Sequence, residues 1–157
     1  MRGRKHLRRL DRILPGLSPV LFFITCCVTQ RRGVLASDPV SAVLVFAWRD
    51  AEEVHGWAVG RYVVMPDHVH FFASPRGEKA KSLSQFIECW KRWTSPQIRA
   101  TGVSSFSWQR EFFDHLLRGG ESYEEKWEYV RADPVRRGLV RSADEWPYQG
   151  DVSVLRW

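Results

Sequence analysis

The spacing of apolar and polar positions divides the chain into seven elements. Short apolar or alternating stretches indicate strands, and apolar residues recurring every three or four positions indicate helices. In chain order the pattern predicts a strand, a helix, two strands, a helix, a strand with or without a preceding loop, and a helix, over residues 20–29, 38–53, 56–65, 68–74, 82–100, 107–118 and 122–133. The order β-α-β-β-α-β-α predicts an α+β fold, a ferredoxin-like antiparallel sheet with helices packed on one face.

The ends of the predicted helices carry residues that usually mark such ends. Asp38 followed by proline is typical of a helix start, and Ser82 with glutamine three residues later forms a capping box. The third helix has the same box at Ser122, and Pro134 is expected to end it. Pro96 interrupts the second helix, so a kink or an end is expected there.

Length and composition fit a single domain. The chain has 157 residues, of which 44% are hydrophobic, enough for one core. Residues 1–19 are rich in arginine and are predicted to be a basic N-terminal arm that leads into one domain at residues 20–157. The apolar run 20–28 is too short to span a membrane. The three cysteines match no disulfide framework or zinc spacing, so a cytoplasmic protein with reduced thiols and no membrane association is expected.

The charge of the chain favours polyanion partners. Its formal net charge is +6 and its pI is about 9.6. A basic domain gains affinity for nucleic acid because neutralised phosphates release counterions. Eight tryptophans add flat rings that can stack on unpaired bases, although most of them are expected to be core.

Two histidines stand at the start of a predicted strand, directly after the turn at Pro66-Asp67. Side chains two apart on a strand point to the same face, so His68 and His70 are expected side by side, with Val69 turned into the core. Two imidazoles on one face can be adjacent ligands of a divalent metal. A pair of hydrogen-bonded surface histidines is the alternative.

A tyrosine lies off the apolar stripe of the third predicted helix. Tyr123, Trp127 and Val130 recur at i, i+4 and i+7 and are expected to be buried, whereas Tyr129 points elsewhere. Asp133 follows Tyr129 by four residues, which makes the phenol and the carboxylate neighbours on the helix. A plain surface tyrosine is the alternative.

Together these residues define a reaction. Two histidines and a carboxylate can fix Mg²⁺ or Mn²⁺, which polarises a scissile phosphate. The oxygen of Tyr129 can then attack phosphorus, release a 3′-hydroxyl and leave the 5′ end on the protein. A metal-dependent nuclease that uses water, with Tyr129 only as a hydrogen-bond donor, is a second interpretation.

Four blocks of the sequence resemble a known family. They are MPDHVHFF, SLSQFIECWKRWTS, WQREFFDH and KWEYVRADPVRRGLV, in this order between about residues 20 and 140. They are similar to the REP-associated branch of the HUH single-tyrosine transposases, relatives of the small insertion-sequence transposases. The resemblance implies that His68 and His70 bind the metal and that Tyr129 is the nucleophile. The family usually has asparagine where this chain has Asp133, so Asp133 is either a metal ligand or a structural residue at the helix end.

The resemblance also implies a substrate and partners. The expected substrate is single-stranded DNA with hairpins, such as repetitive extragenic palindromes, which the protein would nick and rejoin. A hairpin-binding module for DNA or RNA that no longer cleaves is the alternative, and a homodimer is one assembly that the family allows. Basic residues are expected to contact phosphates, and they are Arg4, Lys5, Arg8, Arg9, Lys91, Arg92, Arg131, Arg136 and Arg137.

Overall fold

The fold is an antiparallel sheet with helices on both sides. The structure, a computed structural model, describes residues 20–118 and 120–155. The elements are β1 (Leu21–Cys27), η1 (Thr29–Arg31), α1 (Asp38–His55), β2 (Trp57–Val64), β3 (His68–Pro75), α2 (Leu83–Ala100), β4 (Phe113–Leu117), α3 (Gly120–Arg131), α4 (Asp133–Arg136), η2 (Ala143–Glu145) and β5 (Gln149–Asp151). No helix within the described ranges is both long enough and apolar enough to cross a membrane.

The sheet has five strands in the order β4-β1-β3-β2-β5, and every neighbouring pair is antiparallel. The predicted α+β class and the order β-α-β-β-α-β-α are confirmed, with the short α4 and β5 added at the end. The central pair β1 and β3 sets the register of the site, because Thr25 lies opposite His70 and Cys27 opposite His68.

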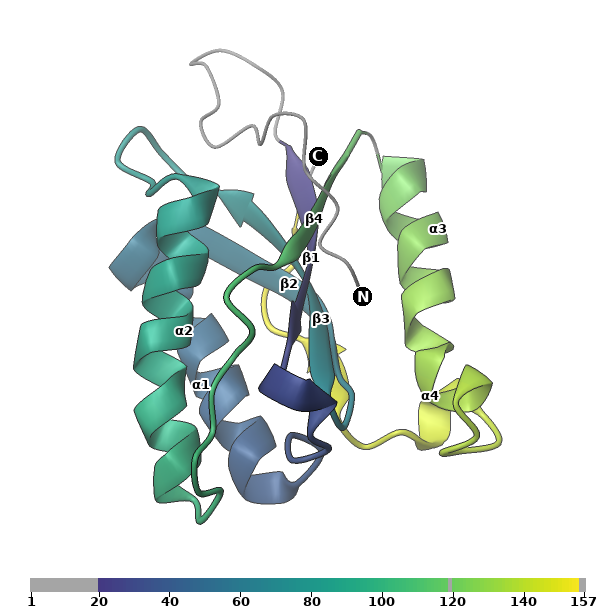
Figure 1. The fold of residues 1–157 in the computed structure, drawn as a ribbon. Coiled ribbons are helices and arrows are strands. Elements are labelled where there is room, and N and C mark those ends of the chain that lie inside the picture. The colour runs from purple at the N-terminus through teal and green to yellow at the C-terminus, as the bar shows by residue number, and fades with distance from the viewer. Residues whose placement is uncertain (1–19, 119, 156–157) are drawn as a thin grey trace.

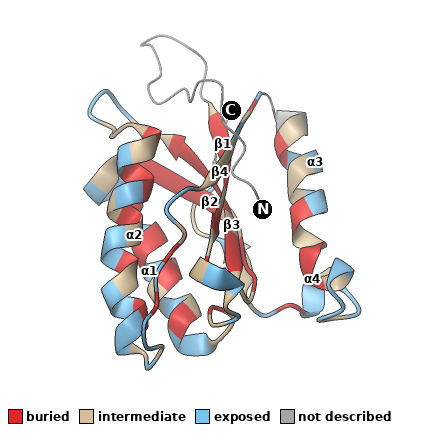
Figure 2. Cartoon of the chain, in the orientation of Figure 1, coloured by how far each residue is buried: buried red, intermediate tan, exposed pale blue. Residues whose placement is uncertain are grey.

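The helices cover both faces of the sheet, which differs in one respect from the prediction. Helices α1 and α2 lie together on one face as expected, but α3 covers the opposite face (Figure 1). The strands show why, since β1 buries Phe22 and Ile24 among the residues of α1 and α2 and buries Phe23 on the other side. A strand that is apolar on both faces needs a cover on both. Figure 2 accordingly shows buried residues on the sheet and on the sides of the helices that face it.

The helix ends differ in detail from the predicted ones. Ser37, not Asp38, caps α1, since its side chain accepts a hydrogen bond from the amide of Val40. The capping box at Ser82 is confirmed. Pro96 does not end α2, which continues to Ala100 because the last turn buries Ile98 completely. Helix α3 begins at Gly120, so the box expected at Ser122 lies inside it.

Helix α3 is fixed to the sheet by its buried stripe. Tyr123 is 6% exposed, stacks on Phe72 with ring centroids 4.8 Å apart, and accepts a hydrogen bond from the amide of Arg61 at 3.2 Å. The hydroxyl reaches this amide at an irregularity of β2 next to Gly60, where a Cβ atom would lie 2.8 Å from it. Glycine at this position therefore permits the close approach of the helix.

We expect Tyr123→Ala to lower the free energy of unfolding by about 3 kcal/mol or more. The change removes a buried ring, leaves a cavity between α3 and the sheet, and deprives the amide of Arg61 of its acceptor. Urea denaturation measures the loss. Tyr129→Ala is the matched control on the same helix, since Tyr129 is 62% exposed and should cost less than about 1 kcal/mol. Equal losses for the two variants would contradict this account of how α3 is attached.

Candidate metal and nucleophile site

Strand β3 presents the two histidines toward α3. A turn at residues 65–67 precedes the strand and is closed by a hydrogen bond of 2.8 Å from the amide of Met65 to the carbonyl of His68. Val69 and Phe71 face α1 and α2 and are fully buried, so His68 and His70 face the other side. His68 is only 2% exposed, and the ring of His70 stacks on Phe23 with centroids 5.4 Å apart. The expected alternation is confirmed.

Asp133 reaches the histidines from the corner between α3 and α4. Ala132, the single residue between the two helices, keeps helical angles of φ −82° and ψ −5°. The chain therefore continues its helical path into Asp133, although proline follows. The residue is 8% exposed, an unusual state for a carboxylate unless it is paired.

The three side chains converge on one point. The Nε2 atoms of His68 and His70 are 3.1 Å apart, and Oδ2 of Asp133 lies 3.1 Å from the first and 3.0 Å from the second. Adjacent ligands of an octahedral ion lie about 3.0 Å apart when each is about 2.1 Å from the ion. The triangle therefore fits one face of an octahedron and leaves the opposite face open, the arrangement of two histidines and one carboxylate known as a facial triad.

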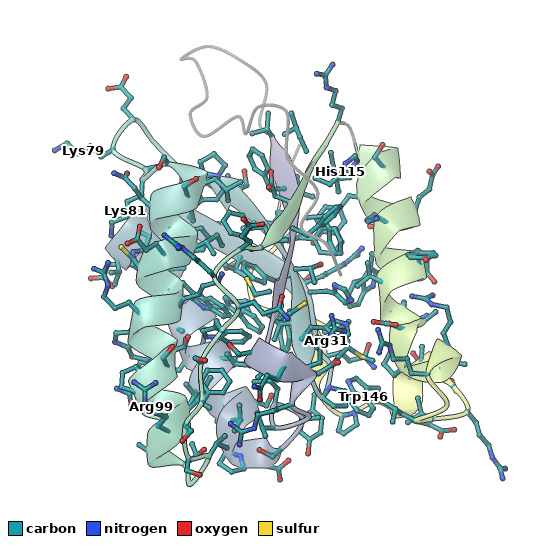
Figure 3. All side chains as sticks on the ribbon, viewed as in Figure 1. Arg31, Lys79, Lys81, Arg99, His115 and Trp146 are labelled. Atoms are coloured by element: carbon teal, nitrogen blue, oxygen red, sulfur yellow. The ribbon has the colours of Figure 1, made fainter. Side chains whose placement is uncertain are left out.

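A second layer of contacts orients both imidazoles. Nδ1 of His68 lies 2.6 Å from Oδ1 of Asp67, and Nδ1 of His70 lies 2.8 Å from the hydroxyl of Thr25. An ionised carboxylate only accepts, so His68 donates to Asp67 from Nδ1, and its neutral form keeps the lone pair on Nε2. Arg31 holds Asp67 in turn, donating from Nε to Oδ2 at 2.8 Å. Figure 3 shows Arg31 at the end of the sheet near α4.

The ionisation of the site suits a cation. Burial is the main cause that lowers the pKa of His70 to about 4, so its imidazole is neutral near pH 7. Burial raises the pKa of Asp133, but hydrogen bonds with His68 and His70 outweigh it and hold this pKa well below its ordinary value. Three such acceptor atoms about 3 Å apart repel one another wherever no proton or metal ion lies between them. One metal ion satisfies all three atoms, whereas a proton serves one pair.

Tyr129 lies one helical turn before Asp133. Residues four apart on a helix have Cβ atoms roughly 5–6 Å apart, so the phenol stands beside the triad rather than within it. Its side chain is 62% exposed and open to a large substrate. The guanidinium of Arg136 lies over the ring, 4.2 Å from its centroid, and donates to the carbonyl of Tyr129 at 2.7 Å. These two contacts fix the tyrosine against Arg136, which also lies 3.7 Å from Oδ1 of Asp133.

Nine basic residues were predicted to bind DNA, and the five that the structure describes fall into three groups. Arg136 and Arg137 lie at the site, with nitrogens 3.7 and 3.4 Å from Oδ1 of Asp133. Arg131 forms ion pairs with Glu128 and Asp144. The two cations of α2 lie on the opposite face of the sheet, where Lys91 donates to carbonyls of residues 109–111 and Arg92 pairs with Glu88. The remaining four, Arg4, Lys5, Arg8 and Arg9, lie outside the described residues.

Several residues of the site were not identified from the sequence. Thr25 and Phe23 meet His70 through strand pairing, which depends on a register that a single sequence does not reveal. Arg31 and Asp67 are hydrogen-bonded although they lie 36 positions apart in the sequence. Asp67 did carry a signal, since a carboxylate directly before a predicted metal-binding histidine is a candidate partner for that ring.

Comparison with known proteins identifies the class of protein that this fold and site define. A sequence model described as "Transposase IS200 like" matches residues 20–132. The matched segment covers most of the chain and includes β1, both histidines and the tyrosine. The chain belongs to the IS200-like transposase family, whose members are enzymes that cut DNA and transfer the cut strand.

Individual relatives of the chain include proteins of the REP-associated branch. A REP-associated tyrosine transposase of Escherichia coli (strain K12) is 27% identical over 132 residues, which cover 81% of this chain and 73% of that protein. A Haemophilus influenzae protein assigned to the same group is 24% identical, with coverages of 82% and 77%. A solved structure of a REP-associated tyrosine transposase bound to a REP hairpin has the same fold, with a TM-score of 0.67 and 23% identity over 91% of this chain and 82% of that one.

We expect Asp133→Ala to weaken Mn²⁺ binding at least tenfold, because it removes one of three converging ligand atoms. Isothermal titration calorimetry measures the affinity. Asp144→Asn is the control, since this exposed carboxylate pairs with Arg131 outside the triad and should leave the affinity unchanged. Equal Mn²⁺ affinities for wild type and Asp133→Ala would show that the triad does not hold the ion.

Asp67→Asn tests the second layer with all three ligand atoms intact. The amide cannot accept the Nδ1 proton of His68 as strongly and loses the charge that attracts Arg31, so the ring is less well oriented. We expect Mn²⁺ affinity to fall about 10–100-fold. The same calorimetric titration reports it, and circular dichroism should show an unchanged fold. A variant that binds as tightly as wild type would remove Asp67 from the metal site.

Proposed function

We propose that the protein is a metal-dependent single-strand DNA endonuclease and strand transferase that cuts hairpin-associated DNA through a 5′-phosphotyrosine at Tyr129. His68, His70 and Asp133 hold the divalent cation. The observation that carries the proposal is the position of Tyr129 one turn before Asp133, whose carboxylate meets both histidines at 3.0–3.1 Å. Tyr129 and Asp133, the triad residue that meets both histidines of β3, lie on adjacent turns of one helical path, so nucleophile and triad can act on the same phosphate.

The residues divide the chemistry between them. A bound Mg²⁺ or Mn²⁺, held by the two imidazole nitrogens and the carboxylate oxygen, would supply Lewis-acid polarisation of the scissile phosphate. The oxygen of Tyr129 forms a bond to phosphorus while the bond from phosphorus to the 3′-oxygen breaks. The phenol proton passes to solvent, and the 3′-oxygen takes a proton from solvent. One phosphodiester replaces another, so a later attack by a 3′-hydroxyl can rejoin the strand.

Single-stranded DNA with a hairpin is the proposed substrate. The chain carries a net charge of +6, and the structurally similar transposase was solved with a REP hairpin. Tyr129 is exposed, so a flexible strand can reach it, whereas a rigid duplex would have to open first. Since the triad and Tyr129 come from one chain, a monomer contains every residue that the reaction needs.

We expect wild-type protein with Mn²⁺ to form a covalent adduct with members of a hairpin oligonucleotide pool that carries single-stranded flanks and a 3′-end label. Attack by Tyr129 keeps the 3′ portion of the strand on the protein, so the label should migrate with the polypeptide on a denaturing gel. Tyr129→Phe should abolish the adduct, and His68→Ala should reduce it at least 100-fold. Tyr148→Phe, which removes a hydroxyl bonded to Asp38, should retain it.

The outcomes separate the competing functions. Cleavage by Tyr129→Phe that leaves a free 5′-phosphate would assign the protein as a metal-dependent nuclease using water. Hairpin binding without cleavage, in any metal, would assign it as a binding module. Either result would overturn the phosphotyrosine mechanism.

A further inference from the structure

A lysine of α3 lies beside the proposed nucleophile and the histidine triad. Nζ of Lys126 is 4.7 Å from the ring centroid of Phe23 and 5.6 Å from that of Tyr129. Phe23 stacks on His70, so the ammonium group and the metal ligand share one aromatic neighbour. Burial is the largest cause that lowers the pKa of His70, and the charges of His68 and Lys126 lower it further. The effect of Lys126 on this pKa also indicates that its charge lies close to the triad.

Among residues 20–118 and 122–155, whose side chains the structure describes, the ammonium group of Lys126 has no hydrogen-bond acceptor and no ion-pair partner. Neighbouring cations are engaged, since Arg136 contacts Tyr129 and Asp133, and Arg61 pairs with Glu124 at 2.9 Å. Lys126 is half-buried, so aromatic rings replace part of its water shell and no carboxylate balances its charge. A partly desolvated cation without an anion is a binding site for one.

Helical spacing joins this cation to the reacting groups. Lys126, Tyr129 and Asp133 occupy positions i, i+3 and i+7, which lie on one face of a continuous helical path. A phosphate placed between the nucleophile and the metal triad would therefore lie within reach of the lysine. Its non-bridging oxygens are the only anionic atoms that the proposed reaction brings to this point.

We propose that Lys126 is a further catalytic residue, which binds a non-bridging oxygen of the scissile phosphate and stabilises the charge that develops on it. The inference rests on the proposed phosphotyrosine function and adds a second cation to it. Lys126 transfers no proton in this step, so the bonds and protons are those given above. As Tyr129 attacks, negative charge concentrates on the oxygens around phosphorus, and a fixed ammonium group favours this state over the ground state.

We expect Lys126→Met to slow single-turnover adduct formation about 100-fold, with Lys126→Arg restoring part of the rate and DNA affinity changing less than about threefold. Lys79→Met is the control, because Lys79 lies on the far side of the molecule (Figure 3).

The decisive substrate carries a methylphosphonate at the cleavage position, which replaces one charged oxygen by a neutral methyl group. In one of the two isomers the methyl group takes the place of the oxygen that faces Lys126. On that isomer wild type should no longer react faster than Lys126→Met, so the two proteins should react at nearly the same rate. If the methylphosphonate slowed wild type and Lys126→Met by the same factor, the rate losses from the two changes would be independent. That result would show a merely structural role of Lys126 and overturn the proposal.

A second measurement works whether or not cleavage occurs. Reductive methylation of lysines in the Tyr129→Phe protein, with Mn²⁺ and the hairpin pool, should show Lys126 protected by DNA and Lys79 unprotected. Protection without any adduct from wild type would refute the phosphotyrosine function while keeping the phosphate contact. Wild type could instead form the adduct while DNA fails to protect Lys126 and Lys126→Met keeps full activity. That result would refute the role of Lys126 and leave the phosphotyrosine function intact.

Discussion

The attachment of α3 to the second apolar face of the sheet is the constraint on which the site depends. The histidines belong to the sheet, whereas Tyr129 and Asp133 belong to the helical segment that crosses it. Burial of Tyr123 and Val130 holds that segment in place. Apolar burial is not directional, so the position along the sheet comes from the hydrogen bond between Tyr123 and the irregular part of β2. Function thus depends on packing at Tyr123, about two helical turns before Tyr129.

The triad concentrates polar groups that are costly to bury, and the second layer offsets that cost. Asp133 gives one oxygen to the histidines and turns the other toward Arg136 and Arg137. Each imidazole likewise has a partner on its far nitrogen. Both carboxylate oxygens and all four ring nitrogens therefore have defined neighbours, as buried polar groups require. Such a network keeps its geometry before an ion binds, which favours binding because little reorganisation follows.

The sequence predicted the local features of the site better than its long-range features. Period-two alternation placed His68 and His70 on one face, and helical periodicity separated Tyr129 from the buried stripe, because both patterns depend only on neighbouring residues. The face covered by α3 was mispredicted, although the unbroken apolar run of β1 implied two covered faces. A lysine's role was harder still to predict. Lys91 was expected to contact phosphates and Lys126 was not singled out, yet Lys91 binds backbone carbonyls and Lys126 faces the site.

An aspartate at position 133 explains why a second cation is useful at this site. A carboxylate ligand cancels part of the charge of a divalent ion, where a neutral amide ligand would leave it whole. The ion then attracts an entering phosphate less strongly, although it is itself held more tightly. Arg136 and Arg137 do not fully restore the attraction, since both face the carboxylate. Lys126 has no such partner within the described parts of the chain, so its charge is available to the phosphate. A carboxylate ligand for tight metal binding and a separate ammonium group for the substrate thus form one consistent electrostatic arrangement.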